Sequence, residues 1–204
     1  MSGKFIVFEG IDGAGKTTQV NLLLEKLEKE GKSAYLTAEP TDLPTGRELR
    51  RVLSGDVKKS DCEIAALFTL DRIAHNKDAV AGIERVLAAG YDVICDRYYY
   101  STLAYQGFST DYEWVKSMNV GCPEIRRPDL CIFLDLTPEE SLERIQRGRD
   151  KLEIYENVGT LTKVRDAFHK ALTDLGDSEN IAIVNAYRTP EEISDEIWEI
   201  YSKL

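Results

Sequence analysis

The sequence predicts an α/β fold, a five-stranded parallel sheet with helices on both faces and a small lid. Five short apolar runs, rich in β-branched and aromatic residues, are typical of strands buried on both faces. Segments with apolar residues at helical spacing lie between these runs, as the crossover connections of a parallel sheet require.

The strands are predicted at residues 4–9, 33–38, 91–95, 130–136 and 181–184. Helices are predicted at residues 15–30, 47–53, 61–89, 101–104, 112–118, from 138, 160–175 and 190–201. Gly31 and Gly90 are typical helix stops. Thr137 is expected to be the N-cap of the helix that has Pro138 in its first position.

A chain of 204 residues is long enough for one domain with a substantial core, and no biased linker divides it. We therefore expect a single domain over residues 1–204. Residues 144–156 are highly charged and contain Gly148, which favours either a solvated helix end or a mobile lid at about 144–158.

The net charge of −10 argues against nonspecific nucleic-acid binding, which needs a basic surface. The start of the chain lacks a signal-peptide pattern, and no apolar run reaches membrane-spanning length, so no membrane partner is expected. None of the four cysteines forms a C-x-x-C pair, and Cys95 and Cys131 fall in apolar runs where we expect burial. These features together predict a cytoplasmic protein.

The segment GIDGAGKT at residues 10–17 matches G-x-x-x-x-G-K-[ST], the phosphate loop (P-loop), between a predicted strand and a predicted helix. Its backbone N–H groups and the helix N-terminus are suited to phosphate oxygens. Lys16 is expected to reach the β- and γ-phosphates, and the Thr17 hydroxyl to bind Mg²⁺. The predicted ATP-binding residues here are Gly10, Ile11, Asp12, Gly13, Ala14, Gly15, Lys16, Thr17 and Thr18.

The loop predicts use of a nucleoside triphosphate without selecting a reaction. Residues 76–79 (NKDA) miss the guanine-reading N-K-x-D pattern, and Ile11 stands where ParA-like ATPases carry a second lysine. Asp12 is an unusual carboxylate in a phosphate site. It indicates contact with a hydroxyl or a metal-bound water, or else a surface position at the loop tip.

Five stretches in order resemble the thymidylate kinase family over nearly the whole chain. They are FEGIDGAGKTTQ at residues 8–19, EPT at 39–41, F-x-x-x-R at 68–72, DRY with STLAYQG at 96–107, and the charged stretch at 147–156. The resemblance implies a P-loop NTPase fold and a dTMP kinase that converts ATP and dTMP to ADP and dTDP, with Mg²⁺ bound alongside ATP.

The resemblance implies that Arg97 grips the dTMP phosphate, for which its fork geometry is suited. It implies that Asp12 accepts a hydrogen bond from the 3′-hydroxyl. Asp96 is expected to hold Mg²⁺ through water, to orient the acceptor, or only to end its strand. With Thr17 it forms the predicted metal pair. The predicted catalytic residues are Lys16, Asp12, Arg97 and Arg149.

Base recognition follows from the same resemblance. Phe68 is expected to stack on thymine, although core packing is the alternative, and Arg72 to bond a ring carbonyl from the same helix face. Gln106 is expected at the base edge and Tyr105 against the deoxyribose. The full predicted dTMP-binding set is Asp12, Glu39, Phe68, Arg72, Arg97, Ser101, Tyr105, Gln106 and Tyr155.

The sequence departs from some family members at two positions. Gly13 stands where some carry a basic loop residue, so a lid cation is expected instead: Arg149, with Arg147 and Lys151 as alternatives. Ala38 stands where some carry an arginine.

Several further expectations rest on weaker signals. The Glu39–Pro40 bond is expected to favour the cis form. Arg50 or Arg51 is expected near the acceptor phosphate, and Arg144 against adenine together with the backbone of residues 186–188. No role is assigned to His75 or His169.

Two other functions stay open on the sequence. One is a deoxyribonucleoside kinase, which shares the fold and would use a general base such as Glu39. The other is a non-enzymatic nucleotide-binding switch, which would not phosphorylate an acceptor. The expected partners are ATP and dTMP as substrates and a second copy of the chain, because the family usually forms homodimers and the 61–89 region offers apolar faces.

Overall fold

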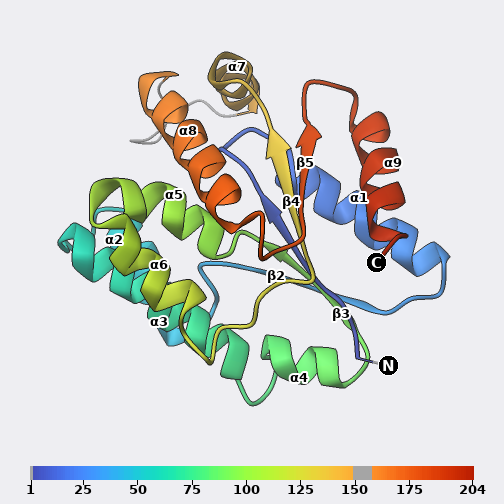
Figure 1. Cartoon of the computed structure of the whole chain (residues 1–204), viewed down its shortest axis with the longest axis horizontal. Helices are drawn as coiled ribbons and strands as arrows, with labels where there is room; N and C mark the ends of the chain where they lie inside the picture. The colour runs from blue at the N-terminus through green and yellow to red at the C-terminus, as the bar shows by residue number, and fades with distance from the viewer. Residues whose placement is uncertain (1, 149–157) are drawn as a thin grey trace.

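The computed structural model describes residues 2–148 and 158–204. Its sheet has five parallel strands in the order β2-β3-β1-β4-β5, which confirms the predicted α/β fold (Figure 1). The strands are β1 (Phe5–Glu9), β2 (Ala34–Ala38), β3 (Asp92–Asp96), β4 (Leu130–Asp135) and β5 (Ile181–Asn185).

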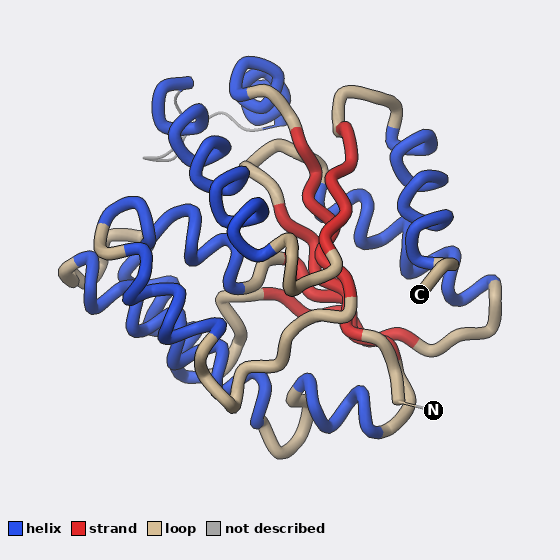
Figure 2. Tube along the Cα trace, in the orientation of Figure 1, coloured by secondary structure: helices blue, strands red, loops and turns tan. Residues whose placement is uncertain are grey.

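The helices connect successive strands and cover both faces of the sheet (Figure 2). They are α1 (Lys16–Lys29), α2 (Pro44–Leu53), α3 (Asp61–Lys77), α4 (Ile83–Ala88), α5 (Tyr99–Ser109), α6 (Tyr112–Val120), α7 (Pro138–Gly148), α8 (Val158–Leu175) and α9 (Pro190–Tyr201). Helices α1 and α9 lie together on one face, and α3, α5, α6 and α8 lie on the other (Figure 1).

The strand register brings three carboxyl ends to one edge of the sheet. Phe8 of β1 lies opposite Asp96 of β3, and Glu9 lies opposite Phe133 of β4. Ligands of open α/β sheets bind outside this edge, where the strand order changes direction. In this sheet β1 lies between β3 and β4: the chain first crosses to β2 and β3 on one side of β1 and later adds β4 and β5 on the other side.

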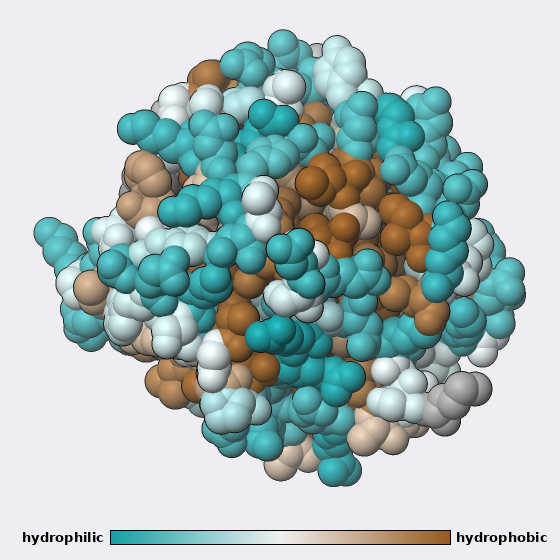
Figure 3. Space-filling view, in the orientation of Figure 1, coloured by the Kyte–Doolittle hydropathy of each residue, from teal (hydrophilic) through white to brown (hydrophobic). Residues whose placement is uncertain are grey.

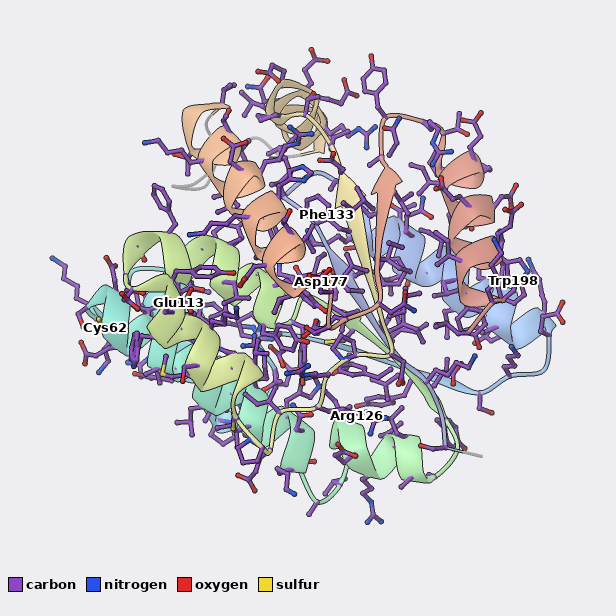
Figure 4. The ribbon with its side chains drawn as sticks, viewed as in Figure 1. Cys62, Glu113, Arg126, Phe133, Asp177 and Trp198 are labelled. Carbon is purple, nitrogen blue, oxygen red and sulfur yellow. The ribbon has the colours of Figure 1, made fainter. Side chains whose placement is uncertain are left out.

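The core is built on the three central strands. Every residue of β1 is buried, and Phe133 of β4 lies between the sheet and α8, where its ring centroid is 5.2 Å from that of Phe168 (Figure 4). Cys95 and Cys131 are buried in β3 and β4 as expected.

The expectation of burial on both faces is wrong for the edge strands. Ile183 of β5 is 54% exposed, and apolar side chains gather on the visible face over β5 and the adjoining α9 (Figure 3). Strand β2 at the opposite edge is also partly exposed. An edge strand has only one neighbour in the sheet, so an apolar run does not by itself reveal its lower burial.

The single helix predicted at 61–89 is two helices, α3 and α4. The Asp78 carboxylate accepts hydrogen bonds from the backbone N–H groups of Val80 (3.0 Å) and Ala81 (2.7 Å), which forms a local turn. A Cβ at Gly82 would lie 2.5 Å from the carbonyl oxygen of Asp78, so the turn also needs a glycine. Aspartate competing with the helix for backbone groups is the physical reason for the break.

Other boundaries shift without changing the order of elements. The piece predicted at 101–104 is the longer helix α5, which runs through Gly107. Helix α6 packs closely at this glycine: a Cβ there would lie 3.0 Å from a ring carbon of Tyr112. Thr137 is the N-cap of α7, where its hydroxyl oxygen accepts from Glu140 N–H at 3.4 Å. In residues 2–148 and 158–204, no helix is both long and apolar enough to cross a membrane.

Candidate active site

The phosphate loop joins the end of β1 to the first turn of α1, as the sequence predicts. Gly10, Gly13 and Gly15 have φ values of 146°, 77° and 93°. These lie in the region where a side chain is strained, so the loop depends on glycine at these positions.

Lys16 begins α1 and its side chain is buried over the loop. Its Nζ donates to the carbonyl oxygens of Gly10 (3.0 Å) and Ile11 (3.2 Å). Burial, followed by the positive charge of Arg97, lowers the pKa of Lys16 to about 8, although Asp96 and Asp12 act in the opposite direction. The loop thus contains a desolvated cation that an anionic ligand would stabilise.

Helix α7 packs directly against the loop. The Ser141 hydroxyl donates to the carbonyl oxygen of Asp12. A Cβ at Gly13 would lie 2.8 Å from the Ser141 carbonyl oxygen and 3.2 Å from Cγ1 of Ile145. A side chain at position 13 is therefore disfavoured both by contact with α7 and by the positive φ of the backbone there.

Arg97 follows β3 and reaches the loop. It has a φ of 68°, which is uncommon for a residue with a side chain. Its guanidinium donates to the Asp12 carboxylate, to Ser101 Oγ (3.0 Å) and to the Gly10 carbonyl oxygen (3.4 Å), and it lies 5.7 Å from the ring centroid of Tyr105. Three other predicted dTMP-binding residues (Asp12, Ser101 and Tyr105) thus meet around the guanidinium of Arg97.

Glu9 supports the contacts around Arg97 through Ser101. The sequence interpretation did not assign it a role. Its buried carboxylate accepts from Ser101 Oγ (2.6 Å) and from the backbone N–H groups of Tyr98 (2.8 Å) and Ser101 (3.1 Å). Burial raises the pKa of Glu9, and the charge of Arg97 opposes that rise. Because Ser101 donates to Glu9, its oxygen is oriented to accept from Arg97. The available signal was a lone acidic residue ending an apolar strand.

A cavity of about 780 Å³ opens at this edge of the sheet. Thr17 and Asp96 both line it, and Oδ1 of Asp96 is buried without a hydrogen-bond partner among the described residues. Arg144 of α7 lines it too and donates to the carbonyl oxygen of Ala186 at 3.0 Å, which brings together the two predicted adenine contacts. The lining comprises Asp12, Gly13, Ala14, Gly15, Lys16, Thr17, Thr18, Gln19, Asp96, Arg97, Glu140, Arg144, Ile145, Arg188, Pro190 and Ile193.

A second polar group, which we call the Glu39 cluster, is largely buried, and the Arg72 guanidinium within it lies 5.0 Å from the ring centroid of Tyr98. The cluster comprises Thr37, Glu39, Arg72, His75, Thr102 and Asn119. The Glu39–Pro40 bond is cis, as expected. Glu39 Oε2 accepts from Arg72 Nη2 at 2.6 Å, and Oε1 lies 2.9 Å from His75 Nδ1.

Arg72 is nearly fully buried and bonded on both terminal nitrogens. Besides Glu39, Nη2 donates to Thr102 Oγ1 (3.1 Å) and Nη1 donates to Asn119 Oδ1. Its Nε is buried without a hydrogen-bond partner among the described residues. Phe68 is one helical turn before Arg72 on α3; it is half-buried and stands outside the apolar core of the described residues, which argues against the core-packing alternative.

The loop after β2 is tied to α2 and α3. Arg50 donates to the carbonyl oxygens of Pro40 and Thr41, both at 2.7 Å, whereas Arg51 pairs with Glu48. Asp71 accepts from the Thr41 N–H (2.8 Å) and hydroxyl (2.6 Å). Of the two arginines left open by the sequence, only Arg50 therefore contacts this loop.

Some predicted residues lie apart from these contacts. Arg149, Lys151 and Tyr155 lie outside the described residues, whereas residues 144–148 of the expected lid form the end of α7. Gln106 is on α5 and half-buried, next to Tyr105. The sequence interpretation missed His75, Asn119 and Asp71; His75 stands three residues after Arg72, a helical spacing that could have indicated it.

Comparison with known proteins gives one family. The sequence profile described as thymidylate kinase matches residues 8–197. A probable thymidylate kinase of Pyrococcus horikoshii is 41% identical, covering 97% of this chain and 95% of its own length. A probable thymidylate kinase of Methanococcus vannielii is 39% identical over 95% of this chain and 93% of its own. A thymidylate kinase of Leptospira borgpetersenii is 36% identical over 97% and 92%. The chain belongs to the thymidylate kinase family.

Proposed function

We propose that this protein transfers the γ-phosphoryl group of ATP to dTMP, giving dTDP and ADP. Membership of the thymidylate kinase family supports that reaction. The observation that carries the assignment within the chain is the contact between Arg97, which follows β3, and Asp12 of the phosphate loop. It brings the cation proposed for the acceptor phosphate to the loop proposed for the donor.

The proposed roles follow from position and charge. Lys16 binds the β- and γ-phosphates in the cavity, and Arg97 binds the acceptor phosphate beside it. Two anions approach each other only if both are neutralised, so positioning and charge provide most of the catalysis. Asp12 accepts the 3′-hydroxyl of the acceptor, Tyr105 packs against its sugar, and Phe68, Arg72 and Gln106 take its base. Arg144 and the backbone near Ala186 hold adenine.

The donor set also fits a magnesium ion bound with ATP. Mg²⁺ in such sites keeps several waters and one or two protein oxygens besides the phosphates. The Thr17 hydroxyl and the unpartnered Asp96 Oδ1 line the same cavity and would supply these oxygens. When bound, the ion would neutralise charge on the phosphates.

The wider organisation belongs to the same proposal. We propose a single domain with a lid at about 144–158, a homodimer, and a cytoplasmic location. All four cysteines are free, which suits a reducing compartment.

The alternative of a deoxyribonucleoside kinase is not favoured. Its general base would be Glu39, but both oxygens of that carboxylate are engaged by Arg72 and His75. A base needs to reach the proton that it removes. Glu39 instead accepts hydrogen bonds from the side chains of Arg72 and His75.

Coupled ADP production across a panel of acceptors tests the function. With ATP and Mg²⁺ present, dTMP is expected to give the highest kcat/KM in a panel with dUMP, dCMP, dGMP and thymidine. A preference for thymidine would identify a nucleoside kinase. Nucleotide binding without turnover of any acceptor would identify a switch.

A further inference from the structure

His75 is a buried histidine that the proposed reaction does not use. It is 4% exposed, and each ring nitrogen has a partner. Nδ1 lies 2.9 Å from Glu39 Oε1, and Nε2 lies 2.7 Å from Thr37 Oγ1. The residue connects α3 to both β2 and the cis-proline loop that follows it.

The partners assign the proton positions. Glu39 forms an ion pair with Arg72 through Oε2, so an ionised carboxylate there only accepts hydrogen bonds. Nδ1 of His75 therefore carries a proton and donates to Oε1. In the neutral ring Nε2 is then an acceptor, and the Thr37 hydroxyl donates to it.

As a result the Glu39 carboxylate has no free oxygen left to accept a hydrogen bond from a ligand. Both oxygens of Glu39 are engaged, one by Arg72 and one by His75. The Arg72 Nε–H is buried and has no partner within residues 2–148 and 158–204. A group placed against this N–H satisfies it only if that group is an acceptor, such as a ring carbonyl oxygen.

We propose that His75 is a positioning residue that sets base selectivity: by capping Glu39 Oε1, it withholds that oxygen from an exocyclic amino group. This proposal rests on the proposed function, in which Arg72 faces the acceptor base. The cluster then accepts 4-oxo pyrimidine monophosphates and rejects 4-amino pyrimidine monophosphates.

The helix geometry supports this role. Phe68, Arg72 and His75 are four and three residues apart on α3, so they share one face. Arg72 and His75 contact opposite oxygens of the same carboxylate. Without the His75 donor, Glu39 Oε1 becomes a buried acceptor in need of a partner, which a 4-amino group can supply.

The test compares dTMP with 5-methyl-dCMP, which share the methyl group and differ only at ring positions 3 and 4. In the wild type dTMP is expected to be strongly preferred. His75→Leu removes the donor and is expected to lower the ratio of the two kcat/KM values by about tenfold or more, the effect of one hydrogen bond to a charged group. The ratio of dTMP to dUMP, which differ only in the methyl group, should not change.

Two further variants separate positioning from a general structural effect. His75→Asn keeps an N–H near the Nδ1 position and should restore most of the selectivity. His169→Leu is the matched control, because the chain has only two histidines and His169 on α8 pairs with Asp135, outside the Glu39 cluster and the contacts around Arg97. It should leave both substrate ratios unchanged.

Each outcome decides the proposal. A His75→Leu ratio within about twofold of wild type, or His75→Asn behaving like His75→Leu, overturns it. If His75→Leu does not fold by circular dichroism, Thr37→Val decides instead: it removes the donor to Nε2 and should shift the ratio less but in the same direction, and no shift overturns the proposal. A wild type inactive on dTMP refutes the proposed function itself, which the wild-type measurement shows before any variant is made.

Discussion

The buried charge of Lys16 is expected to lower the stability of the fold. Its charge is buried in the loop, and its pKa of about 8 lies below the value near 10.4 of an exposed lysine. Between these pH values the unfolded chain binds more protons than the folded one, so stability rises with pH. Below about pH 8 the full cost of the buried charge is present.

We therefore expect Lys16→Met to abolish turnover and to raise Tm at pH 7 without nucleotide. Both carbonyls that Lys16 contacts keep another donor, Arg97 at Gly10 and the Ala14 N–H at Ile11. The Tm should rise by several degrees, since each kcal/mol is about 2–4 °C for a chain of this size. The gain should shrink as pH rises from 8 toward 10.

Calorimetry and a coupled assay measure the two effects, with Lys29→Met on the exposed end of α1 as the control. A variant that keeps more than about a tenth of kcat, a loss under ~1.4 kcal/mol, contradicts the role of Lys16 in transfer.

Replacing Arg97 is expected to weaken binding of the acceptor, dTMP. Arg97→Ala should raise KM for dTMP by about 10- to 100-fold, the value of a charge-assisted hydrogen bond, with a much smaller change for ATP. Ser101→Ala should act in the same direction but less, because Ser101 orients Arg97 from Glu9. Steady-state kinetics measure the two KM values, and isothermal titration measures the dTMP affinity of both variants, with Ser109→Ala at the end of α5 as control. Unchanged dTMP affinity in Arg97→Ala would remove this arginine from the acceptor site.

At the scale of elements, the packing of α7 on the phosphate loop can be isolated with two glycines. Gly13 and Gly15 both have positive φ, but only at Gly13 would a Cβ meet another element: at Gly15 nothing lies within 4 Å in the described structure. Gly15→Ala should cost about 1–2 kcal/mol of unfolding free energy from backbone strain alone. Gly13→Ala should cost at least about 1 kcal/mol more. Urea unfolding without nucleotide measures the free energy of unfolding of both variants. Equal losses would show that α7 moves aside for the added methyl group at no cost in stability.

The connection between α7 and α8 is where we place the second catalytic cation. Since Gly13 offers no side chain, we predict that Arg149→Ala lowers kcat by roughly two orders of magnitude, about 2.7 kcal/mol, with little change in dTMP affinity. Arg147→Ala and Lys151→Ala are the comparisons. If all three single variants and the triple variant turn over normally, the cation comes from elsewhere.

At the scale of the molecule, we predict a homodimer through the surface of α3. Leu70 on this helix is 50% exposed, which is unusual for a leucine among buried neighbours. Sedimentation equilibrium should give about twice the chain mass of 23.0 kDa. Leu70→Glu should shift the equilibrium toward monomer, whereas Val80→Glu, at an 83% exposed position after α3, should not. A monomeric wild type would contradict the prediction.

The alternation of strands and helices, the phosphate loop and the loop-to-helix junction could be predicted because their causes are local in the sequence. Strand length, glycine spacing and caps each act within a few residues. The break at Asp78 could not, since it depends on a side-chain turn that competes with helical periodicity. The Glu39 cluster could be predicted only in part: the family resemblance places Glu39 and Arg72 in one site, whereas Asn119 joins them only through the packing of α6 against α3.

The pairing of Arg97 with Asp12 has a consequence for inhibitor chemistry. The charge of the Arg97 guanidinium is already neutralised by the Asp12 carboxylate. An inhibitor group that binds Arg97 must therefore displace this carboxylate. Neutral phosphate isosteres bring no charge to that exchange and should bind weakly, whereas dianionic phosphonates meet its requirement. The same pairing should select against halide and other monovalent anions, since a single diffuse charge gains little by displacing the Asp12 carboxylate.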